Sequence, residues 1–354
     1  MIDMLYVRYS LTESEFELTY SRLDAYLKKY IPLKPLHKDN KEKRGVYITY
    51  ALSKYGLQEI RLRKSQYNSF FIEVRLRPQL LINCCGYYKS TTLDEFKYAE
   101  LVFDYIILDI LNLPVPSIRK WKVRRIEAVA DIEVDNALIP YYIQLFKKGH
   151  ILEYFLENKY SRKYWNSKTN VYLMANKVTV NWYDRYNTLK AKEKKSKDEF
   201  IDYSETKNIL RFETQVRKVN KPLMEVLNVN FLKTKVLDHY KLIVGKGDYH
   251  TINNAIALVL SSTSRPVGLI VMLRLIEETG SIPAAKEKYT QQVQERGKKS
   301  NPDDFSKKRI LHDFNKKLQQ IRRLNINPVT IPEQWGIPTL KNLHSLISEA
   351  FYTE

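Results

Sequence analysis

The sequence contains little cysteine and few of the short motifs that mark common active sites. Its 354 residues include two cysteines, Cys84 and Cys85, and adjacent cysteines cannot form a disulfide framework or half of a spaced zinc site. The six histidines show neither His-x-His nor HExxH spacing, and no GxGxxG motif occurs. These absences argue against a disulfide-rich domain, a histidine zinc centre and a dinucleotide-binding fold, and they favour a reducing compartment.

Long apolar runs are also missing. The most apolar stretch, Ala255–Ile276, is interrupted by polar residues and a proline at Ser261–Pro266, so it is too short to span a bilayer. The first residues, Met1–Leu5, have neither the basic region nor the apolar region of a secretory signal. The sequence therefore predicts a cytoplasmic protein without a membrane partner.

Acidic residues are scarce relative to basic ones. There are 59 lysines and arginines against 40 aspartates and glutamates, which gives a formal net charge of +19, together with 26 tyrosines, 13 phenylalanines and 4 tryptophans. Such a composition suits a protein that neutralises phosphates and stacks bases. A ribosome-associated or simply basic protein is the alternative that composition alone leaves open.

Hydrophobic periodicity and capping signals divide the first part of the chain. Two capping boxes, Thr12–Glu15 and Thr92–Glu95, predict helices that end near Pro32 and Pro114. Alternating residues predict strands before and between these helices, at Leu5–Tyr9, Gly45–Tyr50, Ile60–Arg63 and Phe70–Leu76.

A similar order follows. A strand is expected over Val123–Asp135, a helical pattern over Leu138–Leu156, and strands at Asn170–Met174, Val178–Tyr183 and Ile209–Val216. We therefore expect an α+β fold with an antiparallel sheet, helices packed on one face and a duplicated element order. Because the remaining sequence is helical in pattern, we expect residues 1–230 to form one domain and residues 231–354 a helical DNA-binding or accessory domain.

Carboxylates concentrate on two of the expected strands. Strand alternation places Glu127 and Asp131 on one sheet face, and Glu213 joins them if the two strands lie close together. Like charges at this spacing require compensating cations, and oxygen ligands suit Mg²⁺ or Mn²⁺. Glu127, Asp131 and Glu213 are therefore predicted metal ligands. An exposed strand face balanced by lysines is the alternative.

Two tyrosines follow the strand at Val178–Tyr183. Tyr183 lies on the polar face of that strand, and Tyr186 with Lys190 has a spacing that brings both side chains to one face of a helix. A phenolic oxygen can attack a phosphodiester while cations such as Lys190 and Arg211 stabilise the developing charge. Both tyrosines are kept as candidate nucleophiles. Packing against the strand end is the alternative for each.

Basic residues form two candidate DNA contacts, each of which has a solvated surface as its alternative. The first is the charge run that contains Lys192, Lys194, Lys195 and Lys197. The second is a helix whose apolar stripe leaves a basic surface that suits a phosphate backbone or a major groove, with candidate contacts at Lys307, Lys308, Arg309, Lys316, Lys317, Arg322 and Arg323.

Several of these segments, taken in order, resemble a known family. Met1-Ile2-Asp3, Arg125-x-Glu127-x-x-x-Asp131, Trp182–Arg185 and Leu210–Glu213 are similar to segments of phage and plasmid replication initiators of the filamentous-phage gene II/X type. The resemblance covers about residues 1–230, with a fainter likeness at about residues 279–330. The paired histidines of the wider rolling-circle initiator superfamily are absent.

The resemblance implies an enzyme. Such proteins nick one DNA strand at an origin through a tyrosine and a divalent metal, remain attached to the 5′ end, and later rejoin the strand. It also implies single-stranded or supercoiled origin DNA as a partner, together with a host helicase and polymerase. A non-catalytic, sequence-specific DNA-binding protein and an RNA-binding protein are the alternatives that the sequence leaves open.

Overall fold

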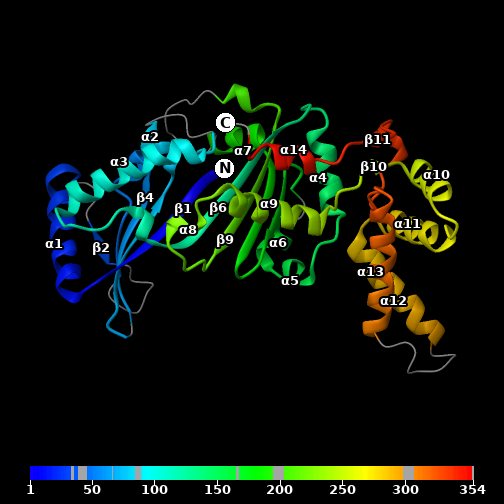
Figure 1. The fold of residues 1–354 in the computed structure, drawn as a ribbon, viewed down its shortest axis with the longest axis horizontal. Coiled ribbons are helices and arrows are strands. Elements are labelled where there is room, and N and C mark those ends of the chain that lie inside the picture. Colours follow the sequence, from blue (N-terminus) through cyan, green and yellow to red (C-terminus); the bar gives the residue numbers. More distant parts are fainter. Residues whose placement is uncertain are drawn as a thin grey trace.

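The computed structural model describes residues 1–32, 36–38, 46–65, 67–83, 89–164, 167–193, 203–297 and 307–352. Cys84, Cys85, Lys194, Lys195 and Lys197 lie outside these ranges, so the predictions that rest on them stay predictions. The fold is α+β: a nine-stranded antiparallel sheet carries helices, and further helices follow in the C-terminal part (Figure 1).

The first half of the sheet region begins with a strand that leads directly into a helix. The side chain of Thr12 accepts the backbone N–H of Glu15 and starts α1, and Thr92 starts α3 in the same way, so both predicted capping boxes are confirmed. Its elements are β1 (Ile2–Leu11), α1 (Glu13–Tyr30), β2 (His37–Lys38), β3 (Val46–Thr49), β4 (Leu57–Lys64), β5 (Phe70–Leu76), α2 (Pro78–Ile82) and α3 (Leu93–Leu111).

The second half contains the acidic strand and the strands that follow it. The predicted helical stretch Leu138–Leu156 is divided into two helices. Gly149 lies between them, where a Cβ atom would be only 2.6 Å from the carbonyl oxygen of Ile243, so a residue without a side chain is required there. The elements are β6 (Lys122–Glu133), α4 (Ile139–Lys147), α5 (Glu153–Leu156), α6 (Lys159–Tyr164), β7 (Asn170–Met174), β8 (Val178–Asp184), α7 (Arg185–Glu193), β9 (Ile209–Arg217), α8 (Leu223–Val226) and α9 (Val229–Ile243).

The two halves repeat one topology. The strand order across the sheet is β2-β3-β4-β5-β1-β6-β9-β8-β7. Within it, β3-β4-β5-β1 and β7-β8-β9-β6 run in the same sequence from each outer side toward the centre, where β1 pairs with β6. The chain order also matches in outline, since helices follow the central strand of each half (α1, and α4 to α6) and its last strand (α2 and α3, and α8 and α9), whereas β2 and α7 have no counterpart. The repeated element order expected from the sequence is therefore confirmed.

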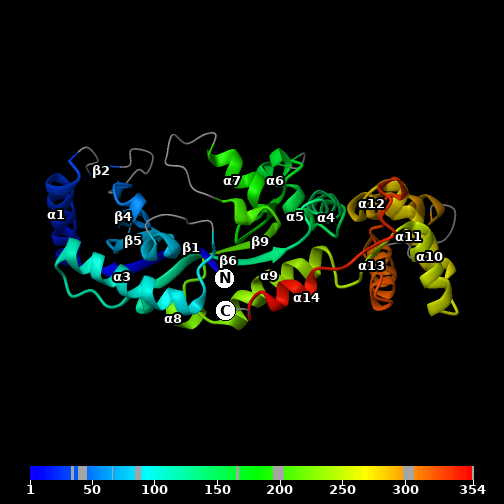
Figure 2. The same cartoon turned by 90° about the horizontal axis from the view of Figure 1, so that it is seen from above.

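Large apolar side chains join the sheet to its helices. Trp182 and Phe212 on β8 and β9 contact Phe146 on α4 and Tyr240 on α9, with ring centroids 5.3–5.9 Å apart. In the first half, Phe103 on α3 packs edge-on against Trp121. Figure 2 shows α9 and α14 (His344–Glu349) on one side of the sheet and α7 on the other. The face opposite α9 is therefore the one on which polar residues can gather.

The C-terminal helices form a separate group beside the sheet (Figure 1). The boundary expected at residues 230 and 231 falls inside α9, which packs on the sheet through Tyr240. The chain then forms β10 (Tyr249–His250), α10 (Ile252–Ser262), α11 (Val267–Thr279), α12 (Ile282–Gly297), α13 (Lys307–Arg323), β11 (Thr339–Leu340) and α14, which returns to the sheet beside α9. Among the described residues, no helix combines the length and the apolar character needed to cross a membrane.

Candidate active site

The site is built on the polar face of β6 and β9. Ile126, Ala128, Ala130 and Ile132 are buried in the core, which directs Glu127 to the opposite face. In the antiparallel register, Glu127 pairs with Gln215 and Val129 pairs with Glu213. Glu127 and Glu213 are therefore diagonal neighbours, and they are only 3% and 8% exposed. The expected meeting of these two carboxylates is confirmed.

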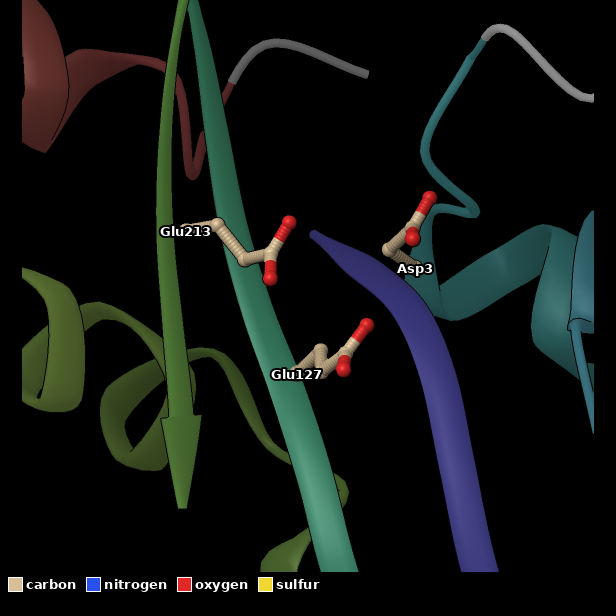
Figure 3. A group of neighbouring side chains, drawn as sticks. All are labelled: Asp3, Glu127 and Glu213. Atoms are coloured by element: carbon tan, nitrogen blue, oxygen red, sulfur yellow. The ribbon is translucent and has the colours of Figure 1, made fainter. Parts of the chain in front are cut away.

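A third carboxylate comes from β1. The register between β1 and β6 shifts between Ile2 and Leu5, and Asp3 lies within this irregularity. Such bulges re-aim side chains. One carboxylate oxygen from each of Asp3, Glu127 and Glu213 lies within 4.8 Å of the other two (Figure 3). We call these three residues the acidic cluster.

Asp131 occupies a different environment from the one expected. Its two carboxylate oxygens accept hydrogen bonds from Nε and Nη2 of Arg211, its register partner on β9. Arg211 is fully buried, and its Nη1 also lies 3.2 Å from Oδ1 of Asp3. The structure thus places the predicted ligand Asp131 in an ion pair with the predicted catalytic Arg211, while Asp3 takes the place beside the two glutamates. Through its contact with Asp3, Arg211 positions the acidic cluster.

The acidic cluster holds excess negative charge in a buried place. Burial, followed by the charges of Glu127 and Asp3, raises the pKa of Glu213 to about 8. Burial also raises the pKa of Glu127, against the opposing effect of Arg125. Asp3 behaves differently: burial acts to raise its pKa, but the charges of Arg77, Arg211 and Arg185 together lower it. Without a further cation, the acidic cluster therefore retains a proton on Glu213 near neutral pH.

Tyr183 extends from β8 into this cluster. Its hydroxyl lies 3.4 Å from Oε2 of Glu213, and Nη1 of Arg185 donates to the same hydroxyl at 3.2 Å. The residue is 4% exposed, and burial, followed by the charge of Glu213, raises its pKa. The phenol therefore needs a base to lose its proton, and Glu213 is the neighbouring acceptor.

The short segment from Trp182 to Arg185 sets this geometry. Trp182 is buried in the core, so Tyr183 points to the opposite, polar face. The carboxylate of Asp184 then accepts the backbone N–H of Asn187 at 2.9 Å, which stabilises the first turn of α7. The strand thus ends and the helix begins at the point where both Tyr183 and Arg185 reach the acidic cluster.

The other candidate nucleophile has different neighbours. Tyr186 packs against Tyr203 with ring centroids 5.5 Å apart, and Nζ of Lys190 lies 5.7 Å from its ring centroid. The helical Tyr186–Lys190 pairing is therefore confirmed as geometry. Nζ of Lys207 lies over the same ring, so Tyr186 belongs to an aromatic and cationic surface of α7.

Lys192, predicted to contact DNA, is near the acidic cluster. Although the residue reaches solvent, partial burial of its ammonium group, followed by the charges of Arg77 and Arg185, lowers its pKa. Asp3 and Glu213 oppose this effect. Lys192 is therefore a cation close to the acidic cluster, and its contact with DNA stays a prediction.

The donor set fits a hard divalent cation. Asn181 is the register partner of Glu213 and lies on the same strand face as Tyr183. Its Oδ1 atom is buried without a hydrogen-bond partner among the described residues. Three carboxylates and an unsatisfied amide oxygen are the ligands that Mg²⁺ or Mn²⁺ prefers. Asp3, Glu127 and Glu213 would hold the ion, with Asn181 beside them.

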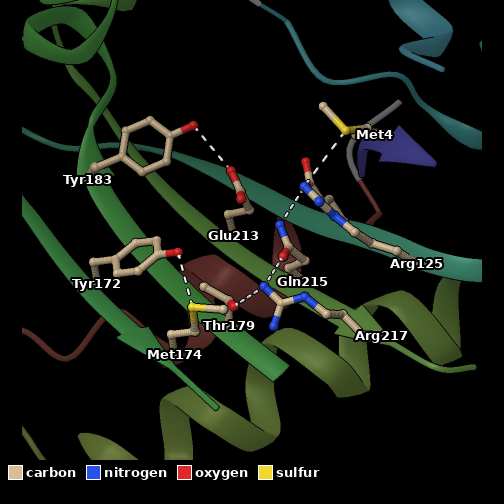
Figure 4. A network of polar contacts seen from close by, with 10 residues as sticks. Met4, Arg125, Tyr172, Met174, Thr179, Tyr183, Glu213, Gln215 and Arg217 are labelled. Carbon is tan, nitrogen blue, oxygen red and sulfur yellow. Dashed lines mark hydrogen bonds and ion pairs between the residues drawn. The ribbon is translucent and has the colours of Figure 1, made fainter. Parts of the chain in front are cut away.

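A polar network surrounds Glu127. Arg125 and Nε2 of Gln215 donate to Oε1 of Glu127, the latter at 2.6 Å. Arg217 in turn donates to Oε1 of Gln215 and, at 2.7 Å, to the hydroxyl of Thr179 (Figure 4). These bonds hold Glu127 in place and bring two arginines to the edge of the acidic cluster.

The predicted basic helix exists as α13. Its apolar stripe of Ile310, Phe314, Leu318 and Ile321 is buried, as expected. Exposed basic residues of this helix are Lys307, Lys308, Arg309, Lys316 and Arg323. Lys317 instead pairs with Asp313 and the Tyr289 hydroxyl, both at 2.7 Å, and Arg322 is half-buried beside Gly245. DNA binding by this helix stays a prediction, and its exposed residues are the ones able to make that contact.

Sequence reasoning missed Asp3 and Asn181 as members of the site. Asp3 was visible only as part of Met1-Ile2-Asp3, and its role depends on β1 pairing with a strand more than 120 positions away. Asn181 lies two residues before Tyr183 on the same strand, and that alternation was the available signal. Comparison of the chain with sequence models of protein families, with curated proteins and with solved structures finds no match.

Proposed function

We propose that this protein is a site-specific nuclease and strand transferase that nicks one DNA strand at a replication origin and later rejoins it. The observation that carries the proposal is the sharing of Glu213 between a tyrosine hydroxyl and a cluster of three carboxylates. A tyrosine hydroxyl, a carboxylate beside it and three carboxylates able to hold a divalent cation lie together, and this arrangement supports the proposal. The family resemblance and the net charge of +19 support DNA as the substrate.

Tyr183, Glu213 and Arg185 have different roles in the proposed cleavage reaction. When Glu213 is ionised, as it would be beside a bound divalent cation, Tyr183 Oη forms a bond to the phosphorus of the scissile phosphodiester and its proton passes to Glu213, while the bond from phosphorus to the 3′ oxygen breaks. The 3′ oxygen leaves and takes up a proton from solvent to become a hydroxyl, while the 5′ phosphate remains on Tyr183. Asp3, Glu127 and Glu213 would hold a Mg²⁺ or Mn²⁺ ion, which would stabilise the negative charge that develops on the phosphate. Arg185 stabilises the phenolic oxygen, and attack by a 3′ hydroxyl on the phosphotyrosine reverses the steps and seals the strand.

The test is formation of a covalent protein–DNA adduct. Supercoiled DNA that carries the sequence flanking the gene is incubated with the protein and Mn²⁺, and adducts are separated under denaturing conditions. We expect Tyr183→Phe to abolish the adduct. Tyr186→Phe is the matched control and retains it, because Tyr186 packs against Tyr203 on α7.

Two results would oppose the proposal. An adduct that persists in Tyr183→Phe would show that another residue is the nucleophile. DNA that is bound by the wild type but never nicked would favour the non-catalytic DNA-binding alternative, for which the exposed basic residues of α13 provide a surface.

A further inference from the structure

The polar face of the first half, together with the adjoining strand β6, carries arginines from the four adjacent strands β4, β5, β1 and β6. Leu5, Leu62 and Val74 are buried on the helix side, so their strand neighbours point to the face opposite α1 and α3. On this face lie two buried glutamates, Glu59 and Glu73. We call the five arginines around them the arginine face: Arg8, Arg61, Arg63, Arg75 and Arg124.

The two glutamates bind and orient three of these arginines. Glu73 accepts hydrogen bonds from Nε of Arg8 and from the hydroxyl of Tyr6, both at 2.6 Å. Glu59 lies 3.0 Å from Nη2 of Arg61 and 3.3 Å from Nη2 of Arg75. Guanidinium groups held in this way are pre-organised for bidentate contacts with phosphate.

Arginines nevertheless outnumber carboxylates among the described residues of the arginine face. Among the described residues of this face, five arginines accompany two glutamates, and Arg61 and Arg63 also make further contacts. Burial and the neighbouring charge of Arg8 lower the pKa of Arg124, with Arg63 acting in the same direction. The side chains still reach solvent, with exposed fractions of 20% for Arg61 and 35% for Arg75. An anion of extended shape is therefore the ligand that this surface accepts.

A continuous row of side chains connects the arginine face to the acidic cluster. Arg75 pairs with Tyr6 across β5 and β1, Tyr6 pairs with Arg125 across β1 and β6, and Arg125 pairs with Arg217 across β6 and β9. Neighbouring strands are about 4.8 Å apart, so this row spans about 14 Å. Arg125 donates to Glu127 of the acidic cluster, so the row runs directly alongside the site.

Aromatic rings lie among the arginines. Tyr6 is half-buried within the row, and Phe71, also half-buried, lies under the guanidinium of Arg8 at 4.3 Å from its ring centroid. Rings on an open sheet face stack with bases only when those bases are unpaired. The combination of a cationic row and aromatic rings therefore favours a single strand over a duplex.

We propose that the arginine face binds single-stranded DNA and guides it along the row to the acidic cluster. This inference rests on the proposed function, because it supplies the substrate path to that site. It also gives the two halves of the sheet different functions. The first half binds the strand, and the second half cuts it.

The experiment measures binding without cleavage. A fluorescein-labelled oligothymidylate is titrated with the full chain in the presence of a chelator, and anisotropy is followed over a range of salt concentrations. The test variant is Arg63→Gln/Arg75→Gln. The matched control is Lys28→Gln/Lys97→Gln, which removes the same charge from α1 and α3 on the opposite side of the sheet. Circular dichroism and thermal melting check that both variants are folded.

We expect the test variant to bind about tenfold more weakly at low salt. Its plot of log affinity against log salt concentration should be shallower by about 1.4, since each lost phosphate contact on a single strand removes about 0.7. The control should match the wild type. Unchanged affinity and slope in the test variant, or an equal loss in the control, would overturn the inference. Tighter binding of a duplex or of an RNA oligomer than of the DNA single strand would also overturn it.

This result is independent of the tyrosine chemistry. If the arginine variant loses binding while no covalent adduct ever forms, the proposed cleavage fails and the binding face stands. If adducts form and the arginine variant binds as the wild type does, the binding face fails and the cleavage stands.

Discussion

The two halves of the sheet share a topology, but the neighbours of a buried glutamate differ between them. In the first half, Glu73 on β5 receives hydrogen bonds from Arg8 and from the hydroxyl of Tyr6. In the second half, Glu213 on the corresponding strand β9 has two other carboxylates within 4.8 Å and a tyrosine hydroxyl at 3.4 Å. One glutamate is neutralised by the chain itself, whereas the other is left among like charges.

This difference shows how a repeated scaffold can carry two activities. Both halves need buried polar residues on the face opposite the helices, and buried carboxylates are costly unless a cation compensates them. The first half meets this need with arginines and so presents a cationic surface. In the second half the carboxylates of Asp3, Glu127 and Glu213 lie together, and we propose that a divalent cation compensates their charge.

The largest effect is expected from the buried arginine of the second half. Arg211→Met removes the partner of both Asp131 and Asp3, and it should lower the free energy of unfolding by about 3–5 kcal/mol. Arg75→Met in the first half removes a partly exposed arginine and should cost less than about 1 kcal/mol. Urea unfolding followed by circular dichroism measures both. Equal losses would mean that the two halves do not differ in how they neutralise charge.

A smaller effect is expected from pH in the metal-free protein. The pKa of Glu213 is raised to about 8 in the folded state, so between its usual value and 8 the folded state binds more protons than the unfolded state. The contribution of Glu213 to the free energy of unfolding is therefore fully present at low pH and is lost as the pH rises. From about pH 6.5 to 8.5 the loss should be about 2 kcal/mol.

Glu213→Gln is the control for this pH dependence. The amide cannot ionise, so the free energy of unfolding of the variant should fall less than that of the wild type over the same pH range, with a chelator present throughout. The same slope in both proteins would show that Glu213 is already ionised in the folded state, and the contrast with the first half would then lose its electrostatic basis.

The smallest effect concerns the two tyrosine–glutamate contacts. Tyr6→Phe removes a short hydrogen bond to Glu73 and should lower the free energy of unfolding by about 1 kcal/mol. Tyr183→Phe removes a long contact to Glu213 and should cost less. Thermal melting in a chelator compares the two variants. A larger cost for Tyr183→Phe would indicate a structural role for that hydroxyl.

Local features of both halves could be predicted from the sequence. Capping boxes at Thr12 and Thr92 begin the two long helices of the first half, and alternation along β6 placed Glu127 on the polar face. These features depend on residues that are neighbours in the chain. For the same reason, the position of Tyr183 opposite the buried Trp182 was readable from β8 alone.

Other features depend on pairing between distant segments. Asp3 reaches the acidic cluster because β1 lies beside β6 with an irregular register, and Asp131 leaves the expected ligand set because β9 places Arg211 directly opposite it. The register of β1 with β6 and that of β9 with β6 cannot be predicted from the pattern of neighbouring residues in the sequence. The packing of α9 on the sheet is likewise set by contacts of Tyr240 with side chains from β8 and β9.

The central claim is that the second half of the sheet, and not the first, is completed by a divalent cation. Titration with Mn²⁺, followed by electron paramagnetic resonance of the free ion, tests it most directly. We expect the wild type to bind Mn²⁺ at a site that Glu213→Gln removes. Glu73→Gln, the corresponding change in the first half, should retain that site, with circular dichroism to check that both variants are folded. Undiminished Mn²⁺ binding in Glu213→Gln, or its loss in Glu73→Gln, would contradict it.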